Sequence, residues 1–182
     1  MKNTVSATNK KFDVRQIAVC AVFTALTCVF TMFLQIPTGS AGGMVHIGNI
    51  PLFTAAALFG KKTGAVVGGV GMALSDLLTG WAPWAPITLI TVGIMGFVYG
   101  LIVNRQPTLT RLITASATVL IVKVAGYYLG ETVMYGSFLV PLASIPGNII
   151  QIAVNSVIAV PVILFLNSSC HSLIAKLCPS AR

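Results

Sequence analysis

Gly71–Pro86 reads GMALSDLLTGWAPWAP and joins an apolar run to a turn that holds both tryptophans of the chain. The apolar run contains Asp76, one of only three acidic residues among 182. An ionisable side chain at the centre of a bilayer costs at least about 2.5 kcal/mol, so it usually faces protein or a water-filled cavity. The stretch therefore predicts a polar site at the end of an apolar helix.

The composition of the whole chain indicates an integral membrane protein. It is 56% hydrophobic and 8% charged, with a mean hydropathy of +0.94. A soluble domain carries about 25% charged residues, and a protein this small must still cover its surface with polar groups. The net charge of +8 would suggest nucleic acid in a soluble protein, but the sequence has no basic stripe with interleaved aromatics. We therefore expect the lipid bilayer, and no nucleic acid, as a partner.

Six apolar segments predict the fold class, an all-α bundle of six transmembrane helices. Their expected limits are 17–36, 47–59, 63–78, 87–103, 112–133 and 145–166. The membrane domain then covers 17–167, between cytoplasmic tails at 1–16 and 168–182. The second and third segments are shorter than the roughly 20 residues that a spanning helix needs, so a re-entrant pair is the alternative.

The distribution of lysine and arginine favours six spans and sets their orientation. With the N-terminus inside, the outer loops around 37–46, 81–86 and 134–144 hold no Lys or Arg. The inner side then holds Lys2, Lys10, Lys11, Arg15, Lys61, Lys62, Arg105, Arg111, Lys176 and Arg182. This complete positive-inside bias predicts that both termini are cytoplasmic.

Two neighbouring segments each carry a polar stripe with a spacing of three or four residues, which is that of one helix face. The stripes consist of Lys123, Tyr127 and Glu131, and of Asn148, Gln151 and Asn155. We expect both stripes to face a common interior, with Asp76 and the turn of Trp81 and Trp84 at its outer mouth. His46, in the first outer loop, is either solvated or in contact with a ligand.

Each of these residues also has a purely structural interpretation. Lys123 can act as a counter-ion of Glu131 or Asp76, and the amides can link helices by hydrogen bonds. The tryptophans can belong to the interfacial aromatic belt. Their combination favours a site for a small polar aromatic molecule that enters from outside.

Small residues line one face of two segments and allow helices to approach closely. On the first segment these are Ala18, Ala21 and Ala25, which meet either this chain or another protein. On the third segment they are Gly64, Gly68, Gly71 and Ser75, for which we expect packing within the chain.

Catalytic and cofactor motifs are missing from the sequence. It has no zinc-protease, nucleophile-elbow or ATP-binding glycine pattern, and its four cysteines lack metal-ligand spacing. We expect no enzyme, no metal and no bound cofactor. A self-sufficient secondary transporter is the main alternative to a binding subunit. Inverted repeats would support that alternative, and this sequence does not show them convincingly.

Three stretches together resemble a known family. They are VHIGNIPLFTAAALFGKKTGAVVGGVGMALSDLLTGWAPWAPITLI, KVAGYYLGETVMYGS and ASIPGNIIQ. The chain resembles the substrate-binding S component of an energy-coupling factor (ECF) vitamin transporter over roughly 17–165. Within that class it is most similar to members for hydroxymethylpyrimidine or pyridoxine-type substrates.

The resemblance implies high-affinity capture of a small ring vitamin or precursor at the outer face of a bacterial plasma membrane. A membrane-embedded T component would contact the alanine face, and two cytoplasmic ATPase subunits would use ATP for the import. Asp76 and the tryptophan turn would border the pocket, while Glu131 and Asn155 would complete its hydrogen bonds. Asn49 departs from the acidic residue frequent in the family, which bears on the charge of the substrate if this position touches it.

Overall fold

The computed structural model describes residues 14–37 and 44–177, and these are almost entirely helical. The expected basic residues at positions 2, 10, 11 and 182 lie outside the described residues. The helices are α1 (Val14–Phe33), α2 (Asn49–Phe59), α3 (Lys61–Leu78), α4 (Ala85–Val103), α5 (Leu109–Tyr135), α6 (Ile145–Ser169) and α7 (His171–Leu177). Two 3₁₀ turns, η1 (Ala82–Trp84) and η2 (Val140–Ser144), precede α4 and α6.

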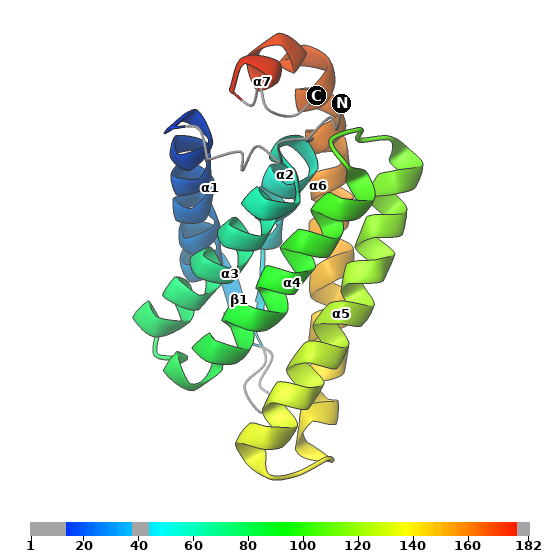
Figure 1. Cartoon of the computed structure of the whole chain (residues 1–182). Helices are drawn as coiled ribbons and strands as arrows, with labels where there is room; N and C mark the ends of the chain where they lie inside the picture. The colour runs from blue at the N-terminus through cyan, green and yellow to red at the C-terminus, as the bar shows by residue number, and fades with distance from the viewer. Residues whose placement is uncertain (1–13, 38–43, 178–182) are drawn as a thin grey trace, which may run out of the picture.

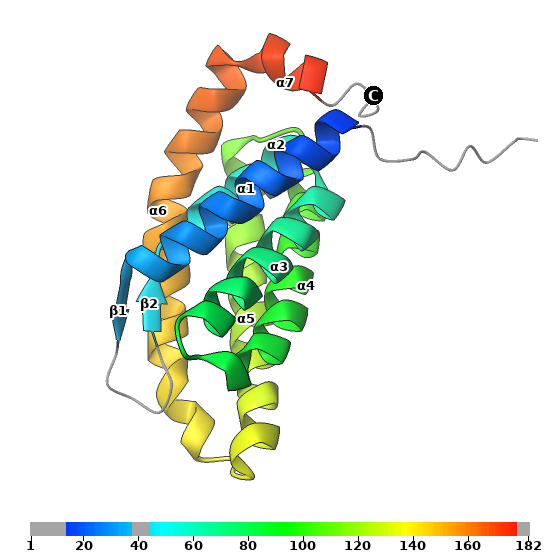
Figure 2. The same cartoon turned by 90° about the vertical axis from the view of Figure 1, so that its left-hand side faces the viewer.

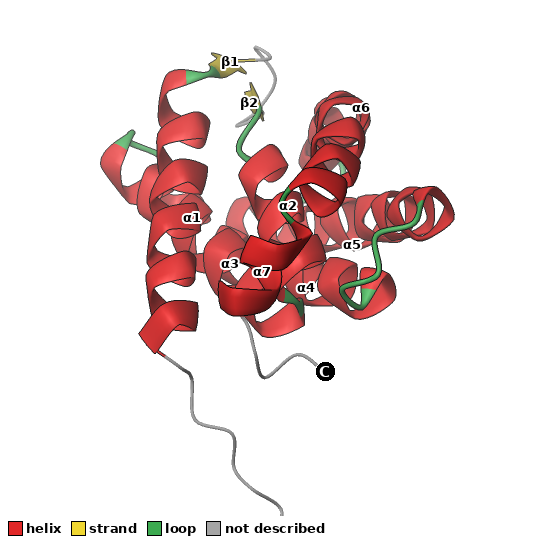
Figure 3. Cartoon of the chain, turned by 90° about the horizontal axis from the view of Figure 1, so that it is seen from above, coloured by secondary structure: helices red, strands yellow, loops and turns green. Residues whose placement is uncertain are grey.

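The helices run between two ends of one bundle (Figure 1). The start of α1, the α2–α3 junction, the α4–α5 junction and α7 lie at one end, which is uppermost in Figure 1. Arg15 of α1 donates to the main-chain oxygen of Lys176 in α7 at 3.1 Å. Helix α1 crosses the outside of the bundle (Figures 2 and 3), and only 17% of its apolar window is buried.

Four helical stretches are long and apolar enough to cross a membrane. They are Val14–Phe33, Ala82–Val103, Leu109–Tyr135 and Val140–Ser169. Helix α2 is apolar but has only 11 residues, and α3 contains Lys61, Lys62 and Asp76. By length and composition the structure therefore shows four of the six expected spans.

Helix α2 forms the centre of the bundle. Ten of its residues are buried, which agrees with a sequence that is apolar on nearly every side. The ring of Phe53 stacks on that of Tyr99 in α4 with 4.4 Å between centroids. Such a short helix is compatible with membrane depth because protein, and not lipid, surrounds it.

Helices α3 and α4 approach each other through glycines. A Cβ atom at Gly96 would overlap the main-chain oxygen of Gly64, and one at Gly68 would lie 2.9 Å from that of Val92. Gly64 and Gly68 also contact Ala56 and Leu52 of α2. The small-residue face of the third segment thus packs within the chain.

A short antiparallel hairpin departs from the expected all-helical course. Strands β1 (Gln35–Pro37) and β2 (Met44–His46) pair Gln35 with His46. The first helix was expected to continue to Ile36 but ends at Phe33. The residue before a proline disfavours helical dihedrals, so Pro37 excludes Ile36 from the helix, and pairing with β2 takes up Gln35.

Candidate ligand-binding site

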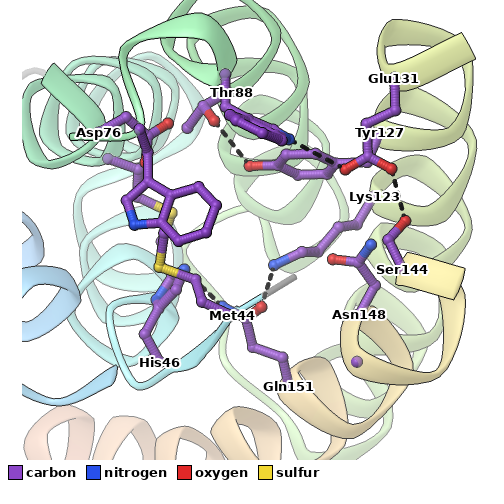
Figure 4. A pocket seen from close by; sticks show the side chains of 14 residues that line it. Met44, His46, Asp76, Thr88, Lys123, Tyr127, Glu131, Ser144, Asn148 and Gln151 are labelled. Atoms are coloured by element: carbon purple, nitrogen blue, oxygen red, sulfur yellow. Dashed lines mark hydrogen bonds between the residues drawn. The ribbon is translucent and has the colours of Figure 1, made fainter. Parts of the chain in front are cut away.

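A pocket lies between α3, α5 and α6, toward the end of the bundle away from α7. Its cavity volume is about 40 Å³. Its lining residues are Met44, His46, Met72, Asp76, Trp81, Trp84, Thr88, Lys123, Tyr127, Glu131, Ser144, Gly147, Asn148 and Gln151 (Figure 4). Sites for drug-sized ligands commonly have about 300–1,000 Å³, so the lining side chains would have to move apart to admit such a ligand.

Glu131 connects the two 3₁₀ turns at the mouth of the pocket. Its Oε1 accepts from the indole Nε1 of Trp84 at 3.3 Å, and its Oε2 accepts from Ser144 Oγ at 2.7 Å (Figure 4). Trp84 also meets the rings of Trp81 and Tyr135 edge to face, at 5.2 and 6.1 Å between centroids. Glu131 is 2% exposed, so these bonds to its carboxylate form largely out of water.

Lys123 begins a chain of polar contacts along the floor of the pocket. Its Nζ donates to Gln151 Oε1 at 2.8 Å and lies 5.5 Å from the ring centroid of Tyr127. Gln151 Nε2 lies 2.7 Å from His46 Nε2; an amide nitrogen can only donate, so the ring nitrogen accepts in this contact. The main-chain nitrogen of Gly48 lies 3.2 Å from His46 Nδ1.

His46 is buried, although the sequence placed it in an outer loop. Burial, and secondarily the positive charge of Lys123, hold the pKa of His46 well below its usual range. The ring is therefore neutral near pH 7. Strand β2 brings this residue into the bundle, which a loop assignment could not anticipate.

Asp76 and Tyr127 face each other across the upper part of the pocket in Figure 4. Tyr127 OH and Thr88 Oγ1 share a hydrogen bond of 3.0 Å. Asp76 is 5% exposed, and its Oδ2 has no hydrogen-bond partner in the described part of the chain. A buried acceptor without a partner costs about 1–3 kcal/mol, so a ligand N–H or O–H at this position would relieve that cost.

Two of the expected binding residues lie outside the lining. Asn155 is fully buried on α6, and its Nδ2 donates to the main-chain oxygens of His46 and Gln151. Asn49 opens α2, is also fully buried, and its side-chain atoms have no hydrogen-bond partner among the described residues. Asn155 thus lies one turn from the lining residue Gln151 on α6 but outside the lining itself.

Five lining residues escaped the sequence analysis. They are Met44, Met72, Thr88, Ser144 and Gly147. None is charged, so nothing distinguishes them in an apolar segment from ordinary packing residues. For Thr88 and Ser144, the hydrogen bonds to Tyr127 and Glu131 reveal their place only once the helices are assembled.

The alanines of the first segment lie on the surface. Ala18, Ala21 and Ala25 are all exposed on α1. Together with exposed Ile17 and Val22, they give this helix an apolar outer face.

An apolar helical bundle with a pocket lined by charged and polar side chains near one end is typical of a membrane protein that binds or transports a small molecule. The family model of the ECF-type riboflavin transporter S component matches residues 11–168. The thiamine precursor transporter HmpT of Lactococcus lactis subsp. cremoris is 32% identical over 148 residues, covering 81% of this chain and 84% of that protein. An uncharacterized protein of Pyrococcus woesei is 34% identical over 108 residues, 59% of this chain and 72% of that protein. A UPF0397 protein of Exiguobacterium sp. is 29% identical over 122 residues, 64% of this chain and 66% of that protein.

The chain belongs to the family of ECF transporter S components. It is a multi-pass membrane protein whose role is transport and not catalysis.

Proposed function

We propose that this chain is the vitamin-binding subunit of an ECF-type importer and captures a small ring vitamin or precursor from outside the cell. The observation that carries the proposal is the pocket itself. It combines a buried acceptor on Asp76 that has no partner among the described residues, an ammonium on Lys123 and two tryptophans that can stack on a flat ring. This lining suits a heteroaromatic ring with an amino or hydroxymethyl substituent.

Hydroxymethylpyrimidine is the substrate that we propose first, with pyridoxine-like rings second. The relative from Lactococcus lactis is described as a thiamine precursor transporter, which supports the pyrimidine. The family model carries the name of riboflavin, so riboflavin belongs in the same binding tests.

The proposed orientation places the pocket toward the outside. Among the described residues, Arg15, Lys61, Lys62, Arg105, Arg111 and Lys176 belong to the end that carries α7. Basic residues concentrate on the cytoplasmic side of membrane proteins, so this end would be cytoplasmic and both termini with it. The pocket then opens at the opposite surface.

Six membrane passes agree with this orientation. The 18 residues of α3 span about 27 Å at 1.5 Å per residue, close to the hydrocarbon thickness of about 30 Å. The shorter α2 continues into strand β2, and both are enclosed by other helices. We therefore propose that α2 and α3 complete the bundle as passes two and three, and not as a lipid-exposed re-entrant pair.

Import would require partner subunits. The exposed alanine face of α1, with Ala18, Ala21 and Ala25, suits close contact with a membrane-embedded T component. Two cytoplasmic ATPase subunits would supply ATP hydrolysis, because the sequence has no glycine-rich phosphate loop of its own.

Uptake in proteoliposomes tests the proposal. The chain alone is expected to bind labelled hydroxymethylpyrimidine without accumulating it, whereas the chain with a T component and ATPases accumulates it only with ATP. Accumulation by the chain alone would instead establish a self-sufficient secondary transporter.

A further inference from the structure

Asn155 occupies a different position from the polar residues that line the pocket. It lies one helical turn beyond Gln151 on α6 and is fully buried. Its Nδ2 donates to His46 O at 2.9 Å and to Gln151 O at 2.7 Å. An amide nitrogen has two hydrogens, so both are engaged. Its Oδ1 is buried without a hydrogen-bond partner among the described residues, and Asn155 is not among the residues that line the pocket.

The hydrogen bond from Asn155 to His46 O holds strand β2, which has little support of its own. The hairpin has only two strands of three residues each, and an isolated two-stranded hairpin is at best marginally stable in water. Asn155 supplies a side-chain donor for the main-chain oxygen of His46 and so joins β2 to α6.

The side chain of His46 extends this attachment to the ligand pocket. Its ring Nε2 lies 2.7 Å from Gln151 Nε2, and Gln151 Oε1 accepts from Lys123 Nζ at 2.8 Å. Asn155 thus bonds the main-chain oxygens of both residues, His46 and Gln151, whose side chains meet. A shift of β2 would release Gln151 and, through it, the ammonium of Lys123.

We propose that Asn155 is a positioning residue for ligand capture, which fixes β2 on α6 so that His46 and Gln151 hold Lys123 in place. The proposal rests on the function proposed above for this pocket. It assigns Asn155 an action through Gln151, in contrast to the direct ligand contact that the sequence suggested.

Hydrogen exchange in the ligand-free full chain tests the attachment of β2. Asn155→Asp keeps the shape of the side chain but removes both donors, so amides of residues 44–48 are expected to exchange at least tenfold faster. Asn155→Ala is expected to give the same result. Ser156→Ala, which removes the neighbouring hydroxyl that has no partner in the described chain, is the matched control and should leave exchange unchanged. Unchanged exchange in both Asn155 variants would overturn the proposal.

A double-mutant cycle tests the action through Gln151. Binding of hydroxymethylpyrimidine is measured calorimetrically for Asn155→Asp, Gln151→Ala and the double variant, each checked by gel filtration. If Asn155 acts through Gln151, the double variant binds within twofold of Gln151→Ala alone. A loss equal to the product of the two single losses would mean independent action and refute the positioning role. If wild type binds no vitamin, the proposed function fails, while the exchange experiment still decides whether Asn155 holds β2.

Discussion

At the scale of single residues, the two carboxylates of the pocket have different tasks. Both oxygens of Glu131 accept bonds from Trp84 and Ser144, so this residue shapes the mouth. Asp76 keeps a buried oxygen without a partner in the described chain, which makes it the better acceptor for a ligand. Sequence reasoning identified both residues because a carboxylate in an apolar segment is conspicuous. It could not separate their roles, which depend on neighbours from other elements.

Removing the acceptor or the stacking ring should weaken ligand binding. Asp76→Ala or Trp84→Ala is expected to raise the dissociation constant for hydroxymethylpyrimidine at least tenfold, about 1.4 kcal/mol, in calorimetric titrations. Thr118→Ala, on an exposed part of α5, serves as the control. Unchanged affinity in both pocket variants, with folded protein, would refute the assignment of this pocket.

The charge of the pocket should select the form of the ligand. Two formal carboxylates, Asp76 and Glu131, outnumber the single ammonium of Lys123, and the neutral ring of His46 adds no charge. Repulsion and loss of phosphate hydration should therefore make the phosphate ester of hydroxymethylpyrimidine bind at least tenfold more weakly than the free alcohol. Competition titrations give the ratio, and equal affinities would contradict this electrostatic account.

At the scale of elements, hydrophobicity located the helices well. Helix α4 begins at Ala85 where the sequence suggested residue 87, and it ends at Val103 as expected. The hairpin and α7 were missed, because three-residue strands and a seven-residue helix are too short to show a clear period. The sequence could not show that Asn155 lies outside the pocket lining for a related reason. Periodicity gives the face of α6 on which a residue lies, but not the position of strand β2 beside it.

The glycine contact between α3 and α4 can be tested by comparing two glycine-to-alanine variants of α4. Gly96→Ala is expected to lower the thermal midpoint of the purified chain, because the added Cβ overlaps the backbone of Gly64. Gly93→Ala is the control, since its nearest new contact is at 3.7 Å. Alanine favours a helix over glycine by about 1 kcal/mol, so Gly93→Ala should be neutral or stabilising. Equal midpoints for the two variants would contradict the described packing.

At the scale of the whole molecule, the bundle separates most of the basic residues from the pocket. The described basic residues other than Lys123 belong to the end with α7, and the pocket lies toward the other. The sequence could predict this sidedness because lysine and arginine positions are read directly from it. Only the assembled bundle shows which polar side chains meet.

Labelling from one side of the membrane tests the orientation. In a variant without its natural cysteines, Leu139→Cys should react with an impermeant maleimide added to intact cells. Gln106→Cys, at the α4–α5 junction, should react only after the cells are permeabilised. The reverse pattern would place the pocket in the cytoplasm and contradict capture from outside.

The identity of the molecule in the pocket is the central claim, and it can be measured directly. The chain is purified in detergent and denatured, and the small molecules that it releases are identified and quantified by mass spectrometry. The account predicts a pyrimidine or pyridine vitamin in near one-to-one amount. Release of no ligand, followed by no thermal shift with any water-soluble vitamin, would contradict it.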